Sequence, residues 1–100
     1  MVIRILDHVS NPSSYKDGEV IYKLLSQEFR SGQKVVLSFD GISSIPSAFV
    51  NAALIKLLEE FSFDSIRANL DIVNSTRQIN RLIKDRFSFA ATERTHPQTK

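Results

Sequence analysis

Hydrophobic and polar positions along the chain follow two different periods, which alternate from the first residues onward. The apolar run VIRIL at 2–6 predicts a short strand, and KVVLSF at 34–39 predicts a second strand that is covered on both faces. IRANLDIV at 66–73 alternates apolar and polar residues and predicts a third strand. Turn-forming residues follow the first two runs, so each of these strands has a clear end.

Three further segments have apolar residues at helical spacing. EVIYKLLSQEFR at 19–30 is the first, and Asp17 and Gly32 suit its start and its end. SAFVNAALIKLLEEF at 47–61 is apolar almost all round, which predicts a helix packed broadly against a sheet. TRQINRLIKDRF at 76–87 carries an apolar stripe, and we expect Asn74 or Ser75 to cap it.

The alternation of strands and helices indicates an α/β domain. Connections of this kind are right-handed crossovers, which produce a mainly parallel sheet. We expect a small sheet of three to five strands with three helices mainly on one face, in a single domain at 1–89 followed by a flexible tail at 90–100. The loops that follow the three strands should meet at one edge of the sheet, where parallel sheets bind their ligands.

Composition supports a folded protein of ordinary character. An apolar fraction of 42% with 24% charged residues is typical of a globular domain. The chain has no cysteine, which excludes disulfides and cysteine nucleophiles and suits a reducing cytoplasm. No apolar run approaches the roughly 20 residues that span a bilayer, so we expect a cytoplasmic protein with no membrane partner.

The residues that catalysis and cofactor binding require are largely missing. Dinucleotide-binding and phosphate-binding loops need grouped glycines, whereas the three glycines of this chain are isolated, at Gly18, Gly32 and Gly41. A serine hydrolase needs small residues around its serine, but IPSAF at 45–49 has proline and phenylalanine there. His8 beside Asp7 falls short of a metal-ligand set. We therefore expect no enzymatic activity, no cofactor and no metal site.

The segment FDGISSIPSAF at 39–49 places several hydroxyl residues where a strand gives way to a helix. In the structural interpretation, Ser47 caps the helix and Ser43 and Ser44 form the turn before it. In the functional interpretation, Ser47 is a phosphorylation site, because the dipole of a helix favours negative charge at its start. The two interpretations are compatible, and both stay open.

Charge is distributed unevenly and suggests a second class of function. From Ser65 onward the chain has seven Lys and Arg residues against three Asp and Glu. Arg77, Arg81 and Lys84 would share one face of the last helix, where they could follow the phosphates of a nucleic acid. That face lacks exposed aromatic residues, and Asp85 lies beside it. Nucleic-acid binding is therefore the alternative to a protein-interaction role.

Two stretches carry a family resemblance. VVLSFDGISSIPSAFVNAALIKLL at 35–58 resembles the STAS domains of anti-sigma-factor antagonists, in which a hydrophobic strand and an acidic residue precede a D-S-S-G-L motif that opens an apolar helix. SYKDGEVIYKLL at 14–25 is similar to the S-R-x-x-G helix start of the bacterial STAS-like domain family of unknown function. The resemblance covers 14–87. It implies a STAS-like α/β sandwich that acts as a non-enzymatic regulatory module.

The match to the antagonist motif is partial. Asp40 corresponds to the acidic residue after the strand, and Ser47 corresponds to the first serine of the motif. Pro46 stands where the antagonists have aspartate, and Phe49 replaces the glycine. Ala48 stands where the antagonists have the serine that a partner kinase phosphorylates. The resemblance therefore supports a docking role more directly than a phosphorylation switch.

We expect the chain to dock on a protein partner such as a histidine-kinase-like ATPase or another bacterial regulatory or defence component. The predicted partner-binding residues lie in the loops after the second and third strands and in the following helices: Asp40, Gly41, Ser43, Ser44, Pro46, Ser47, Asn51, Asn74, Ser75 and Arg77. A homodimer is a further expectation, because the helix at 47–61 is unusually apolar and a short parallel sheet leaves unpaired edges.

Overall fold

The sheet consists of three parallel strands in the order of the sequence. The computed structural model describes the backbone of residues 1–95 and the side chains of residues 1–90. β2 (Val35–Ser38) lies in the centre, between β1 (Val2–Arg4) and β3 (Leu70–Val73). Ile3, Leu37 and Ile72 form one register row, and this row faces the helices. The predicted α/β fold with a small parallel sheet is confirmed.

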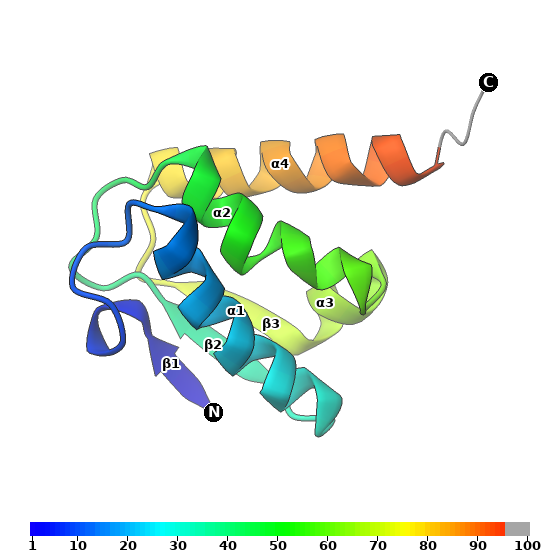
Figure 1. The fold of residues 1–100 in the computed structure, drawn as a ribbon, viewed down its shortest axis with the longest axis horizontal. Helices are drawn as coiled ribbons and strands as arrows, with labels where there is room; N and C mark the ends of the chain where they lie inside the picture. Colours follow the sequence, from blue (N-terminus) through cyan, green and yellow to red (C-terminus); the bar gives the residue numbers. More distant parts are fainter. Residues whose placement is uncertain (96–100) are drawn as a thin grey trace.

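The helices lie on one face of this sheet (Figure 1). The α-helices are α1 (Tyr15–Arg30), α2 (Ser47–Ala53), α3 (Phe63–Asn69) and α4 (Arg77–Thr95), and the 3-10 helices are η1 (Ile5–Asp7) and η2 (Ile55–Glu59). Strands that follow one another in order, with right-handed crossovers, place every connecting helix on the same side. The prediction that 34–39 is covered on both faces is therefore wrong. Val2 is 66% exposed and Val36 half-buried on the uncovered face.

Helix α1 begins earlier than the apolar pattern indicates. Its N-cap is Ser14, whose hydroxyl accepts from the backbone N–H of Asp17, and the side chain of Asp17 accepts from the backbone N–H of Ser14, which completes a capping box. Asp17 is thus the third helical residue rather than the cap. Gly32 ends the helix as predicted: its φ is 75°, and the N–H of Gln33 donates to the carbonyl of Glu28.

Helices α1 and α2 pack so closely that one glycine is required between them. A Cβ atom added to Gly18 would lie 2.6 Å from the Cβ of Ala52 and 2.7 Å from the carbonyl oxygen of Phe49. Glycine is therefore needed at 18 for space rather than for backbone freedom, because any side chain would force the two helices apart. Ile21 and Leu25 continue the contact along α1, and both are fully buried.

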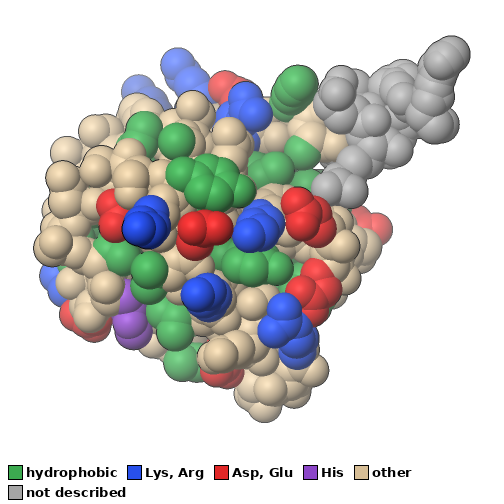
Figure 2. Space-filling model, viewed as in Figure 1, with side chains coloured by type: hydrophobic (Ala, Val, Ile, Leu, Met, Phe, Trp, Pro, Cys, Tyr) green, Lys and Arg blue, Asp and Glu red, His purple; other side chains and the backbone are tan. Residues whose placement is uncertain are grey.

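Ion pairs cross the outer side of this helix pair. Figure 2 shows acidic and basic side chains alternating over α1 and the segment that packs on it. Lys56 Nζ lies 3.7 Å from Glu19 Oε2. The guanidinium of Arg30 donates to Glu60 through Nε and, at 2.7 Å, through Nη2. These hydrogen bonds hold the pKa of the Glu60 carboxyl below its ordinary value and raise the pKa of Arg30.

Helix α2 starts and ends differently from the sequence-based expectation. Pro46 occupies the N-cap position, and its carbonyl oxygen accepts from the N–H of Phe49 and of Val50. Ser47 is the first helical residue, so the prediction that its hydroxyl caps the helix is wrong. The regular helix ends at Ala53 and continues as η2. The apolar sides of α2 are covered by α1 and α4, so its composition no longer indicates self-association.

The segment 66–73 is half helix and half strand. Residues 66–69 belong to α3, whose N-cap Ser62 accepts a hydrogen bond from the N–H of Ser65 at 3.1 Å. The alternation of Ile66, Ala68, Leu70 and Ile72 predicts a strand throughout, which is wrong for its first half. Ile66 and Leu70 are also four residues apart, and a spacing of four suits a helix equally well. The capping serine at 62 is the signal that distinguishes the two.

Helix α4 is capped by Thr76, not by Asn74 or Ser75. Thr76 Oγ1 accepts from the N–H of Ile79 at 3.3 Å, and the Thr76 carbonyl accepts from the N–H of Asn80. The predicted apolar stripe is confirmed, with Ile79, Ile83 and Phe87 buried. The helix continues to Thr95, so residues 90–95 of the predicted tail at 90–100 are helical, and its remainder at 96–100 lies outside the described residues. None of the helices in 1–95 is long and apolar enough to cross a membrane.

Candidate functional site

The loops after the three strands meet at the carboxyl edge of the sheet. They enclose an open hollow of about 640 Å³, lined by Leu6, Ser10, Asn11, Pro12, Ser13, Gly41, Ile42, Ser43, Ser44, Ile45, Pro46 and Gln78. We call the segments 10–13, 40–46 and 74–76, together with Gln78, the three-loop surface. Their convergence follows from the parallel sheet, because all three strands end at the same edge. Figure 1 shows these loops together on the left of the molecule.

Hydrogen bonds join the second loop to the start of α4. Thr76 Oγ1 donates to the carbonyl oxygen of Ser43 at 2.8 Å. The amide of Gln78 accepts from the N–H of Ile45 and donates to its carbonyl, each at 3.4 Å. The hydroxyl of Thr76 therefore serves both as a helix cap and as a link between loops. These contacts fix one loop relative to the other without any bound ligand.

A buried hydroxyl lies beneath these loops. Ser38 is 4% exposed, and its Oγ accepts from the N–H of Asp40 at 3.2 Å and from the side-chain amide of Asn74 at 3.1 Å. Asn74 has a φ of 55°, a left-handed conformation that asparagine tolerates better than most residues. One hydroxyl thus holds the start of both the second and the third loop. The serine is the one polar residue within the apolar run 35–39, which is the signal that could have identified it.

The end of β1 is tied to the second loop by charge. Arg4 donates from Nη1 to Asp7 at 3.0 Å and from Nε to Asp40 at 3.2 Å. These two hydrogen bonds, with Asp7 contributing most, raise the pKa of the Arg4 guanidinium. Gly41, with a φ of 84°, follows at once, and a Cβ there would lie 2.8 Å from Leu6 Cδ1. The left-handed backbone conformation is thus what favours glycine at 41, because the terminal methyl group of Leu6 could move aside.

The structure brings most of the predicted site residues together. Gly41, Ser43, Ser44 and Pro46 line the hollow, and Asp40, Asn74 and Ser75 lie in its loops. Ser47 is exposed at the first residue of α2. The sequence-based set omits Arg4, Thr76, Gln78 and the residues 10–13.

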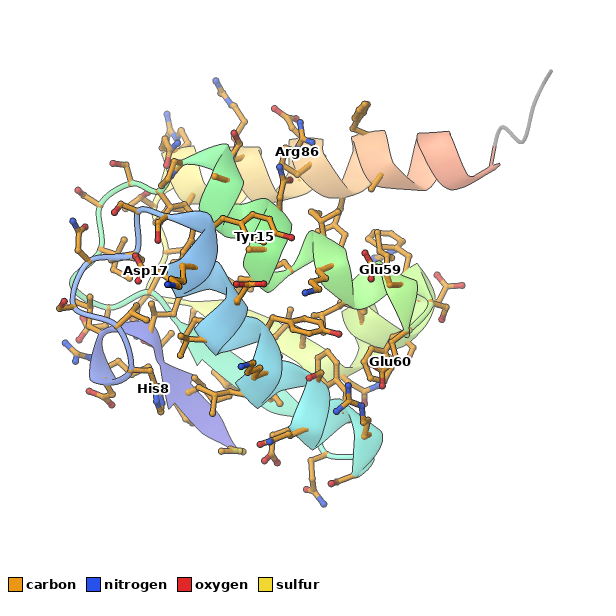
Figure 3. The ribbon with its side chains drawn as sticks, in the orientation of Figure 1. His8, Tyr15, Asp17, Glu59, Glu60 and Arg86 are labelled. Atoms are coloured by element: carbon orange, nitrogen blue, oxygen red, sulfur yellow. The ribbon has the colours of Figure 1, made fainter. Side chains whose placement is uncertain are left out.

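Two of the predicted residues lie elsewhere. Asn51 is half-buried, and its Oδ1 accepts from Arg86 Nε at 3.1 Å, so it joins α2 to α4 instead of facing the loops. Figure 3 shows Arg86 on α4, at the side that faces α2. Arg77 is exposed on α4 and lines a separate depression with Arg81 and Asp85. Sequence spacing could not reveal either position, because each depends on how α4 is placed.

The ionisable side chains of the domain are dispersed, and this bears on the chemistry of the site. Among residues 1–95, no three His, Cys, Asp or Glu side chains are grouped so that they could hold a metal ion. Figure 3 shows Glu59 and Glu60 lying apart, with Glu60 at the end of α1, where Arg30 binds it. The three-loop surface instead presents hydroxyl groups, backbone amides and the Arg4–Asp40 pair. Such groups suit recognition of another polar surface.

The comparison with protein families decides which family this is. The model described as "STAS-like domain of unknown function (DUF4325)" matches residues 17–80. The chain belongs to this STAS-like family. The search of curated proteins and the search of solved structures returned no match.

The matched residues of the STAS-like domain include the parts that build the site. They run from the first turn of α1 into α4 and contain Gly18, Ser38 and Thr76. The first loop and β1 lie before the matched region. Ala48, which stands where the antagonists have their phosphorylated serine, is exposed at the second residue of α2. The surface that the resemblance indicates is therefore accessible, but that position has no hydroxyl.

Proposed function

We propose that this STAS-like domain is a non-enzymatic interaction module of a bacterial regulatory system. It docks on a protein partner, such as a histidine-kinase-like ATPase, through the three-loop surface. The observation that carries the proposal is that all three strand-to-helix loops meet in one hollow, and that hydrogen bonds join the second loop both to the start of α4 and to the end of β1. A surface that is ordered before binding loses little conformational freedom when a partner docks.

The chemistry of the surface also favours a protein partner. Its exposed groups are mostly short and neutral, including Ser43 and Ser44, and the exposed Ser47 lies beside it. Short polar side chains lose little rotamer entropy on contact and can bind backbone groups of a partner. Because alanine occupies position 48, the docking proposed here does not depend on a phosphate at that residue. Phosphorylation of Ser47 stays a separate prediction.

The test compares two variants that add the same charge at opposite ends of the sheet. Ser47→Asp places a carboxylate beside the three-loop surface, at a helix start that tolerates negative charge. Gln33→Asp places one on an exposed loop before β2. Tagged wild-type and variant chains are used to purify partners from the native host, and the affinity of the main partner is measured by calorimetry.

We expect the wild type and Gln33→Asp to bind the same partner equally, and Ser47→Asp to bind it about tenfold more weakly or not at all. Equal affinity of all three chains would remove the three-loop surface from the interface. Recovery of no protein partner in any of the three purifications would contradict the interaction role itself.

Nucleic-acid binding is the second candidate, and one observation favours it. Arg77, Arg81 and Lys84 are all exposed on α4, and none forms an ion pair within the described residues. Figure 2 shows basic side chains along the α4 edge, with an acidic one among them. A gel-shift assay at low and moderate salt tests it: binding that weakens steeply with salt and is lost in Arg81→Glu supports this candidate. The absence of any shift at low salt excludes it.

A further inference from the structure

A second surface lies on the opposite side of the domain from β1, where α3 and α4 border the outer edge of the sheet. A groove of about 460 Å³ runs between the two helices, and residues of β3 line it. Its apolar lining includes Phe63, Leu70, Ile72 and Phe87, and its cationic lining consists of Arg67 and Lys84. None of these residues contributes to the three-loop surface.

The groove is open because the sheet ends at β3. β3 pairs with β2 on one side only, and no strand of the described residues pairs with its other edge. The free edge of a strand presents unpaired N–H and C=O groups, which can pair with another extended chain. Leu70 and Ile72 point to the helix side, whereas Asp71 and Val73 lie on the uncovered face. A chain added beside β3 would therefore direct every second side chain into the groove.

The lining is suited to apolar side chains of an added strand. Phe63, Leu70 and Ile72 are each only half-buried, although they touch the core. Phe63 and Phe87 meet across the groove with ring centroids 5.4 Å apart, so α3 and α4 are held apart by large side chains. Burying the remaining apolar surface of these residues would favour binding by the hydrophobic effect.

Charge selects the kind of chain that would bind. Arg67 and Lys84 are exposed and form no ion pair with any described carboxylate, and the guanidinium of Arg67 lies 5.7 Å from the Phe63 ring centroid. Two cations beside an apolar groove favour a segment with acidic residues. A second copy of this chain is disfavoured, because pairing through β3 would bring the same cations of both copies together.

We propose that the groove between α3 and α4 binds an extended acidic segment of a partner protein, which adds a strand beside β3. Its alternate apolar side chains fill the groove, and its carboxylates pair with Arg67 and Lys84. This docking site is independent of the three-loop surface, so a partner can occupy one without the other. Strand addition of this kind obtains affinity from backbone hydrogen bonds and specificity from alternate side chains.

A displayed library of random peptides, selected in parallel on three full-length proteins, tests the proposal. The first is the wild type, and the second is the double variant Arg67→Glu/Lys84→Glu. The third is the matched control Lys23→Glu/Lys34→Glu, which makes the same charge change at exposed lysines of α1 and of the loop before β2. Circular dichroism of all three proteins checks that the fold is retained.

We expect the wild type and the control to enrich peptides that alternate apolar residues and carry acidic ones. The strongest peptide, made synthetically, should bind Arg67→Glu/Lys84→Glu about tenfold more weakly or worse. Methylation of its backbone nitrogens on the edge that faces β3 should abolish binding, and NMR shifts should centre on Leu70–Val73. The proposal is overturned if no peptide is enriched on the wild type, or if the enriched peptides lack acidic residues. It is also overturned if the protein forms a homodimer and Arg67→Glu/Lys84→Glu strengthens that homodimer.

Discussion

The helix pairs α1–α2 and α3–α4 lie in one small domain but meet in opposite ways. Between α1 and α2 there is no room for a single methyl group at Gly18, because Ala52 and the backbone of Phe49 already fill the space. Between α3 and α4, Phe63 and Phe87 hold the helices apart and a groove of about 460 Å³ is left. Small residues thus produce a closed contact that serves stability, and large ones leave an open contact that is available for binding.

The largest expected difference between the two regions is the effect of shortening a leucine. Leu25→Ala, in the fully buried α1 contact, should lower the free energy of unfolding by about 2–5 kcal/mol. Leu70→Ala, beside the groove, should lower it by about 1–2 kcal/mol, because the side chain is already half exposed. Urea denaturation of both variants measures the two values. Equal losses would mean that the groove side is packed as tightly as the α1–α2 side.

Lengthening the glycine of the closed contact should have the next largest effect. Gly18→Ala should destabilise the protein by about 1–3 kcal/mol, although alanine is the better helix former, because its Cβ would overlap Ala52 and a backbone carbonyl. Gln27→Ala, exposed on the same helix, is the control and should change stability by about 0.5 kcal/mol or less. If Gly18→Ala were the more stable protein in thermal unfolding, the contact would not be closed.

The smallest effect concerns the ion pair at the end of the closed region. Because Arg30 lowers the pKa of Glu60, the pair stabilises the fold above the ordinary carboxyl pKa and this contribution is lost as the pH falls through the lowered value. Glu60→Gln should therefore unfold at a slightly lower temperature than the wild type at neutral pH, and the difference should vanish in acid. Arg30→Gln should behave alike. A difference that persists unchanged in acid would separate Glu60 from this pair.

The sequence predicts the fold well where one period dominates a segment. The stripe in α4 and the run that forms β2 are examples, because their apolar residues suit only one kind of element. The sequence-based prediction is wrong at 66–73, where helical and extended spacing coincide. It is also wrong for β2, whose second face was expected to be covered. An apolar run reports that a strand is central, but strand order decides whether helices cover one face or two.

The candidate site is predictable in outline only. The convergence of loops follows from a parallel sheet, so Gly41, Ser43 and Ser44 could be assigned to it from the sequence. Thr76 and Gln78 could not, because their roles depend on where α4 begins relative to the second loop. The groove by β3 has no sequence pattern of its own, since α3 was not expected and half of the groove belongs to it.

The strand order also bears on how the chain folds while it is being made. Each strand pairs with the one synthesised just before it, so β1, α1 and β2 can assemble before β3 has left the ribosome. β3 then needs only a preformed edge to join. Each partly synthesised intermediate would therefore expose the free edge of its last strand, and chaperones or early partners could shield that edge.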